Sequence, residues 1–169
     1  MGLKGAKPIA LTMGEPAGIA PDITLKAWLS LKDKGSAGFF LIGDATLLKE
    51  RAKALAPDVE IAPIHRAQEA SKIFKAALPV LHRPLAQRPK PGQLAPANAA
   101  QVTGAIEAGV ALALEGEVSA IVTNPIHKKT LYSAGFKHTG HTDYIASLVR
   151  ERGLSAEPVM MLAAPGLRT

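Results

Sequence analysis

The sequence predicts an α/β fold, with a largely parallel sheet and helices on both faces. Short, almost continuously apolar segments alternate with segments whose apolar residues recur every three or four positions. Strands that are apolar on both sides are typical of parallel sheets buried between two helical layers. Hydrophobic residues make up 47% of the chain and charged residues 20%, which fits a folded globular domain.

The elements follow in order from local signals. Six apolar segments are predicted strands: 8–12, 38–43, 59–61, 78–81, 118–122 and 159–163. Helices are expected from Pro21, after Asp44, over about 98–114, over about 128–134 and from near Thr142 toward Arg152. Asp44 can cap the second helix, and Thr142 or Asp143 can cap the last. Residues 83–97 hold four prolines and predict an exposed, irregular connection.

Composition narrows the functional classes. The chain has no cysteine, so disulfides, thiolate metal sites and cysteine nucleophiles are excluded. Its net charge of +6 suits anionic ligands, but the basic residues are scattered and aromatic residues are only 4%, so we expect no nucleic-acid partner. No apolar run approaches the ~20 residues that span a bilayer, and no secretory signal is recognisable. We therefore expect no membrane association and a cytoplasmic location.

Familiar catalytic and nucleotide motifs are missing. The chain has no G-x-G-x-x-G fingerprint, no phosphate-binding P-loop and no G-x-S-x-G elbow. An ordinary Rossmann dehydrogenase, a P-loop enzyme and a serine hydrolase are therefore disfavoured.

The first candidate motif is the segment 12–22, TMGEPAGIAPD, between a buried strand and a helix. Ligands bind at the carboxyl ends of strands in parallel α/β sheets. Glu15 is the chemically active side chain in the middle of this segment. It is either a ligand-facing group or a solvated residue of a tight crossover loop.

Two further motifs can bind an anion. Gly140-His141-Thr142 precedes a predicted helix, whose N-terminal N–H groups and partial positive charge attract phosphate. His141 and Thr142 can add side-chain donors, and Gly140 permits close approach; the alternative is that Thr142 only caps the helix. The third motif is 123–128, TNPIHK, in which Lys128 is either a counter-charge for an anion or part of a solvated helix start.

Together, these segments resemble the PdxA family, the 4-hydroxythreonine-4-phosphate dehydrogenases of pyridoxal phosphate biosynthesis. The resemblance runs along essentially the whole chain. Beyond the three motifs it is carried by Pro91-Gly92-Gln93-Leu94, Asn98, Gly116-Glu117-Val118, Ala134-Gly135 and Val159-Met160-Met161-Leu162. Ala20 stands where the family usually has glycine.

The resemblance implies a two-lobed fold like that of isocitrate and isopropylmalate dehydrogenases, and a homodimer. On this basis residues 1–123 belong to a partial first lobe, and residues 124–169 begin a truncated second lobe. The implied reaction is NAD- or NADP-dependent oxidation and decarboxylation of 4-phosphohydroxy-L-threonine, a small phosphorylated substrate. The family's substrate contacts fall on His141 and Thr142, with Gly140, Lys128 and Glu15 as weaker candidates.

The resemblance also implies a divalent metal (zinc, magnesium or cobalt) bound by three histidines. None of the histidines of this chain, His65, His82, His127, His138 and His141, matches a metal position of the family. We therefore expect residues 1–169 to contain no catalytic residue and no metal ligand. The residues that bind the cofactor stay unassigned, and we expect the chain alone to be inactive. Two alternatives stay open. One is a family dehydrogenase for phosphorylated sugar acids such as 4-phosphoerythronate or phosphothreonate, and the other is a non-catalytic fragment that binds a phosphorylated ligand.

Overall fold

A computed structural model describes residues 6–35, 38–155 and 157–169. The chain divides into two compact units, the first ending at Lys137 and the second running from His138 to Thr169. Each unit is described by itself. The expected lobe boundary at residue 123 concerns a longer, two-lobed protein and stays a prediction.

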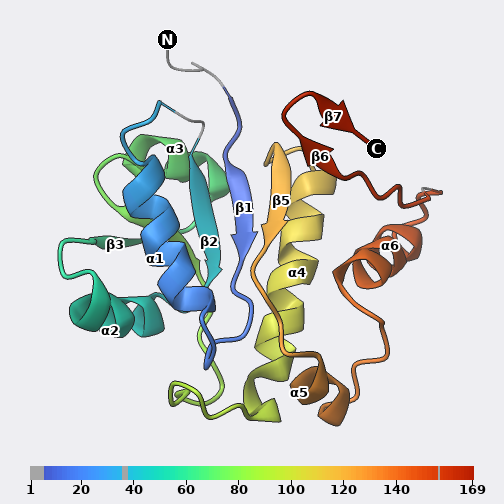
Figure 1. Ribbon diagram of the computed structural model, residues 1–169, viewed down its shortest axis with the longest axis horizontal. Helices are drawn as coiled ribbons and strands as arrows, with labels where there is room; N and C mark the ends of the chain where they lie inside the picture. Colours follow the sequence, from blue (N-terminus) through green and yellow to red (C-terminus); the bar gives the residue numbers. More distant parts are fainter. Residues whose placement is uncertain (1–5, 36–37, 156) are drawn as a thin grey trace. The chain divides into compact units, whose positions relative to one another are not determined.

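The first unit is built on a five-stranded, entirely parallel sheet with the strand order β3-β4-β2-β1-β5 (Figure 1). This confirms the predicted α/β class. The strands are β1 (Ile9–Thr12), β2 (Phe39–Gly43), β3 (Ile61–Ile64), β4 (Leu78–His82) and β5 (Ala120–Thr123). The helices are α1 (Ala20–Leu31), α2 (Ala45–Leu55), α3 (Ala70–Ile73), α4 (Ala99–Leu114) and α5 (Lys128–Ser133), with short 3-10 turns η1 (Ala67–Glu69) and η2 (Pro96–Asn98).

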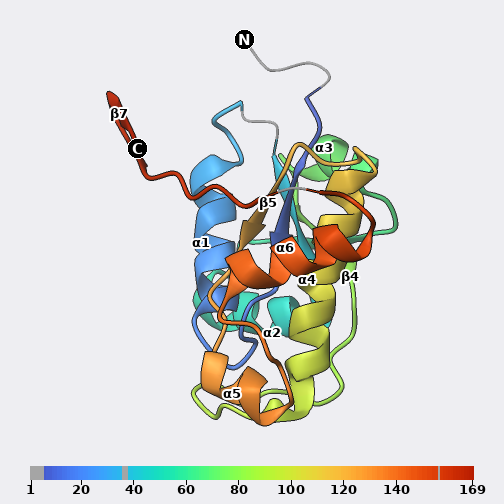
Figure 2. The same cartoon turned by 90° about the vertical axis from the view of Figure 1, so that its right-hand side faces the viewer.

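Successive side chains of the central strands point into two different cores, because side chains alternate across a strand. In β2, Phe39 and Leu41 pack with α1 and α2, whereas Phe40 and Ile42 pack with α4 and α5. Figure 2 accordingly shows α1 on one side of β5 and β1, and α4 on the other. Helices therefore lie on both faces of the sheet, as predicted, but the edge strand β5 is only partly covered, with Val122 48% exposed.

Hydrogen bonds and an ion pair stabilise helices α1 and α2. The Asp22 carboxylate accepts three hydrogen bonds from the Arg51 guanidinium, one from Nε at 2.8 Å and two from Nη2, at 2.5 Å and 2.6 Å. The indole of Trp28, only 1% exposed, donates to the Phe74 carbonyl at 2.8 Å. Asp44 caps α2 by accepting from two backbone N–H groups, which confirms the predicted cap.

Two predictions in the first unit need correction. The strand expected over 59–61 begins only at Ile61, because Val59 closes a turn onto Ala56 before the strand starts. The short helical segment formed by η1 and α3 was not predicted. Its buried residues are alanines, Ala67 and Ala70, which give little periodic signal.

The second unit contains α6 (His141–Glu151) and a small hairpin of β6 (Ala163–Ala164) and β7 (Leu167–Arg168). Residues 159–162 form no strand, so the strand predicted over 159–163 is wrong. Their side chains are 62–88% exposed. Leu162 exchanges two backbone hydrogen bonds with Thr169, but among the described residues of the unit no strand pairs with residues 159–161. An apolar run alone does not make a strand; the backbone also needs a hydrogen-bonding partner.

Candidate functional site

The carboxyl ends of β1 and β5 lie side by side, with Thr12 paired in register to Thr123. The chain leaves β1 for α1 on one face of the sheet, and leaves β5 for α5 on the other face. Neighbouring strands that lead to opposite faces mark a topological switch point, where α/β proteins bind ligands. The first and third candidate motifs meet at this place.

Gly14 lets the two motif loops touch. It adopts φ +68°, and a Cβ built on it would lie 2.6 Å from the Pro125 carbonyl oxygen and 2.7 Å from the Asn124 Cβ. The next residue, Glu15, donates its backbone N–H to the same Pro125 carbonyl at 2.8 Å. Glycine is therefore required here both for its backbone conformation and for the close approach of the second loop.

A buried hydrogen-bond chain fixes the second loop against α1. The Asn124 side-chain amide donates to the Thr24 hydroxyl at 2.9 Å, and that hydroxyl donates to the Ala20 carbonyl at 2.8 Å. Asn124 and Thr24 are 5% and 1% exposed, so neither can exchange these bonds for water. The loops after β1 and β5 are thus rigidly joined.

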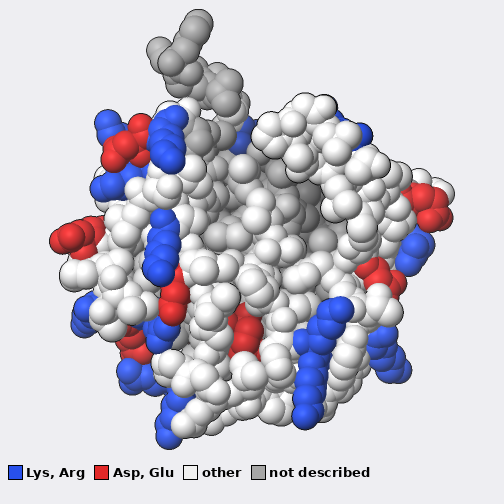
Figure 3. All heavy atoms as spheres, in the orientation of Figure 1, with Lys and Arg blue, Asp and Glu red and all other residues white. Residues whose placement is uncertain are grey.

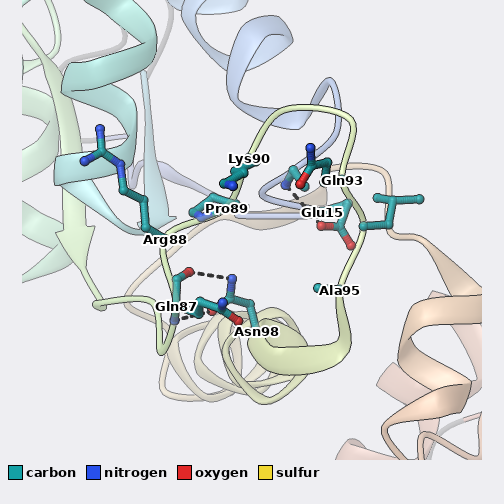
Figure 4. Close-up of a pocket in the computed structure, with 10 residues that line it drawn as sticks. Glu15, Gln87, Arg88, Pro89, Lys90, Gln93, Ala95 and Asn98 are labelled. Carbon is teal, nitrogen blue, oxygen red and sulfur yellow. Dashed lines mark hydrogen bonds between the residues drawn. The ribbon is translucent and has the colours of Figure 1, made fainter.

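Glu15 is buried, with 8% of its surface exposed. The interpretation of Glu15 as a solvated loop residue is therefore wrong. The backbone N–H of Ala17 donates to Glu15 Oε1 at 3.0 Å, which holds the carboxylate in place. The side chain lies in the wall of a cavity of about 290 Å³, which is also lined by residues of the irregular segment 83–97 (Figure 4).

The irregular segment 83–97 forms the rest of this cavity wall. Asn98 binds the backbone of Gln87 in both directions, donating at 2.8 Å and accepting at 2.9 Å. Gly92 donates to the Ala17 carbonyl at 2.8 Å, so the segment is tied to the first motif loop as well. Figure 4 shows Gln93 next to Glu15, while Asn98 and its two bonds lie across the cavity.

Sequence reasoning assigned no site role to the lining residues of this segment. The resemblance had included Pro91-Gly92-Gln93-Leu94 and Asn98, which was the available signal. Pattern alone could not show that a proline-rich connection folds back over the end of β1, because the bond that ties it there joins Gly92 to Ala17, far away in the sequence.

Lys128 is exposed at the first position of α5. The residue before it, His127, caps this helix through its ring: Nδ1 accepts from the Thr130 N–H at 3.2 Å and lies 2.6 Å from the Thr130 hydroxyl oxygen. The helix start is therefore built by His127. The ammonium group of Lys128 lies outside the cavity lined by Glu15.

Gly140, His141 and Thr142 belong to the second unit. Helix α6 begins at His141, with Gly140 in the N-cap position, so the expected cap by Thr142 or Asp143 is wrong. Gly140 is extended here and offers no side-chain cap to the helix. Thr142 is exposed in the first turn, and His141 is half-buried beside it.

Asp143 stabilises the approach to this helix. Its carboxylate accepts from the Thr139 backbone N–H at 3.0 Å and lies 3.4 Å from His138 Nδ1. The Thr139 hydrogen bond, followed by the charge of His138, lowers the pKa of Asp143 below its ordinary value of 3.8. Positions 138–143 are thereby held as a turn that presents the start of α6.

Neither a basic patch (Figure 3) nor a metal-binding cluster stands out among the described residues. Lys and Arg are spread over the face drawn in Figure 3 and do not form one patch. Within residues 6–35, 38–155 and 157–169, no group of three His, Asp or Glu side chains could hold a metal ion. No helix of this described part is both long and apolar enough to cross a membrane.

The fold and this site define a class: a parallel α/β protein with a ligand cavity beside a topological switch point. The PdxA family, described as "Pyridoxal phosphate biosynthetic protein PdxA", matches residues 36–169. A 4-hydroxythreonine-4-phosphate dehydrogenase of Bradyrhizobium diazoefficiens is 42% identical over 170 aligned positions, which cover 96% of this chain and 49% of the relative. The chain belongs to the PdxA family.

Solved structures agree with this assignment. A 4-hydroxythreonine-4-phosphate dehydrogenase from Burkholderia phymatum matches with a TM-score of 0.84 and 29% identity, covering 96% of this chain and 48% of that one. One from Klebsiella pneumoniae matches with a TM-score of 0.82 and 35% identity, covering 96% and 49%. The chain spans about half the length of the relatives it matches, and it corresponds to their N-terminal half.

Proposed function

We propose that this chain is the N-terminal part of an NAD- or NADP-dependent dehydrogenase that oxidises and decarboxylates 4-phosphohydroxy-L-threonine in pyridoxal 5'-phosphate biosynthesis. The observation that carries the proposal is the similarity to 4-hydroxythreonine-4-phosphate dehydrogenases along 96% of the chain. The joined loops after β1 and β5 support it, because they provide a rigid ligand-binding edge.

In this proposal the two units have different tasks. His141 and Thr142 bind the substrate phosphate at the start of α6, where backbone N–H groups and the helix dipole favour an anion. The joined loops of the first unit, with Glu15, contribute a second polar surface for the ligands. NAD(P), when bound, supplies the hydride acceptor, and residues 6–35 and 38–137 contain a polar cavity that fits part of such a ligand.

The remaining parts of the enzyme lie outside this chain in the proposal. The described residues do not fit a divalent metal, so no step through a metal is derived from them. Because the relatives are about twice as long, the chain alone is proposed to be inactive. The complete enzyme is proposed to be a homodimer.

The test is reassembly. The chain is co-expressed with the half of the Bradyrhizobium relative that it does not cover, and the complex is isolated by size exclusion. We expect NADH formation with 4-phosphohydroxy-L-threonine from the complex and none from either half. Turnover of 4-phosphoerythronate or phosphothreonate instead would support the sugar-acid alternative. A stable complex that turns over none of these compounds would defeat the dehydrogenase proposal and leave a phosphate-ligand-binding role.

The phosphate contact is tested in the same complex. We expect His141→Ala to weaken substrate binding by about 1–3 kcal/mol, as for hydrogen bonds to charged groups. The matched control is His65→Ala, an exposed histidine of the first unit. Unchanged KM and kcat for His141→Ala would remove His141 from the site.

A further inference from the structure

The Glu15 carboxylate has hydrogen-bonding capacity that the described residues do not use. A carboxylate offers about four acceptor positions. Among the described residues, only the Ala17 N–H donates to it, and only to Oε1. Neither Glu15 oxygen is among the fully buried side-chain atoms that lack a partner, so Oε2 is open to the cavity. The cavity that Glu15 lines is therefore the place where donors from a ligand can meet it.

Most other polar groups around the cavity are already engaged. The Asn98 amide is bound to the Gln87 backbone in both directions. The Arg88 guanidinium forms an ion pair with Glu50 at 2.9 Å. This leaves the side chains of Gln87, Gln93 and Lys90, all three exposed. The available set is therefore one buried acceptor, two amides and one cation.

We propose that this cavity binds the hydroxyl-bearing fragment of a phosphorylated ligand, with Glu15 accepting from two adjacent hydroxyl groups and Lys90 facing the phosphate. A carboxylate accepts from hydroxyl donors, as acidic residues do at the ribose of bound dinucleotides. An ammonium group at the rim attracts phosphate. The volume of about 290 Å³ lies near the lower end for ligand pockets and suits one sugar-sized fragment.

Two compounds carry this chemistry: the dinucleotide of the proposed reaction, through a ribose, and 4-phosphoerythronate, the substrate of the sugar-acid alternative. The proposed substrate 4-phosphohydroxy-L-threonine has a single hydroxyl group, next to its amino group, and does not meet the requirement for two. In this choice of ligands the inference rests on the proposed function. The switch point of β1 and β5 is independent of that function, because it follows from the strand order and from the opposite faces that α1 and α5 cover.

The experiment is a binding titration of the 169-residue chain by calorimetry, with NAD and with 4-phospho-D-erythronate as separate probes. We expect one probe to bind, which identifies the source of the hydroxyl groups. Glu15→Gln should weaken that probe about tenfold or more, because a hydrogen bond to a charged acceptor is lost. Lys90→Gln should weaken it a few-fold at low salt, with the difference fading at high salt.

The matched control is Glu60→Gln, an exposed carboxylate that does not line the cavity, and it should bind as the unmodified chain does. A second measurement needs no variant: on titration of the unmodified chain, the amide NMR signals of Ala17 and Gln93 should shift and that of Glu60 should not. Failure of both probes to bind, or equal binding by Glu15→Gln, would overturn the inference.

Binding and turnover separate the two proposals. Turnover by the reassembled enzyme without Glu15-dependent binding would end this inference and leave the proposed function intact. Glu15-dependent binding without any turnover would end the proposed function and leave this inference intact.

Discussion

Two apolar runs of this chain differ in burial and in secondary structure. Residues 39–42, Phe-Phe-Leu-Ile, are at most 7% exposed, whereas residues 159–162, Val-Met-Met-Leu, are at least 62% exposed. The first run lies in β2 between two paired strands and two helical layers. In the second run only Leu162 is paired, through two backbone hydrogen bonds to Thr169, and no strand among the described residues of its unit pairs with residues 159–161. Apolar character is therefore not sufficient, because a strand forms where neighbours satisfy its backbone and cover its side chains.

The largest expected effect comes from a substitution at Gly14, where the loops after β1 and β5 are in close contact. Gly14→Ala should lower the free energy of unfolding by about 2–5 kcal/mol, because it adds left-handed strain and forces apart the Pro125 carbonyl and Asn124. The control is Gly35→Ala, which has φ +66° but nothing within 4 Å, so it carries the backbone strain alone, about 1–2 kcal/mol. Urea unfolding of both variants measures the difference. Equal losses would show that the close approach of the two loops contributes nothing.

A smaller loss is expected from Trp28→Phe. The variant removes the indole N–H that satisfies the buried Phe74 carbonyl, which should cost about 1–3 kcal/mol. The exposed Tyr132→Phe serves as the control and should change stability by less than about 0.5 kcal/mol. Thermal unfolding by circular dichroism compares them, and a neutral Trp28→Phe would contradict the role given to this bond.

The exposed run should behave differently. Met160→Ser should change the free energy of unfolding by less than about 0.5 kcal/mol, because Met160 is 74% exposed. It should also reduce self-association in light scattering, since contiguous exposed apolar residues promote association. Met13→Ser, at a residue 3% exposed, is the contrasting variant and should destabilise the chain by about 2 kcal/mol or more. A monomeric unmodified chain would refute the association.

The smallest effect concerns the turn before α6. The pKa of Asp143 is lowered, so the folded chain binds fewer protons at this group than the unfolded chain does. Its stabilising contribution is therefore complete above pH 3.8 and is lost as the pH falls through the lower folded pKa. NMR titration of the carboxyl group measures this.

The matched variant for that titration is His138→Ala. It should raise the pKa of Asp143 only part of the way to its ordinary value, because the Thr139 hydrogen bond is the larger cause and is retained. A return of the Asp143 pKa to its full ordinary value would show that His138, and not the Thr139 hydrogen bond, is the larger cause.

One part of the candidate site, the loop around Glu15, could be predicted from local pattern. Glycine and proline around Glu15 indicated a tight loop after a buried strand, and the apolar run 118–122 placed a second loop at the same edge of the sheet. The burial of Glu15 could not be predicted, because the residues that cover it come from positions 87–98. Gly140, His141 and Thr142 belong to the second unit, whereas Glu15 belongs to the first.

The sequence by itself determined the α/β class, the order of the main strands and helices, and the cap of α2 by Asp44. The periodicity of apolar residues and the capping of a helix depend only on residues a few positions apart. Tertiary structure alone decided that the loops after β1 and β5 touch through Gly14, that a proline-rich segment closes a cavity over Glu15, and that residues 159–162 form no strand. The physical reason is range: these outcomes depend on contacts and hydrogen bonds between segments far apart in the chain, which no local pattern encodes.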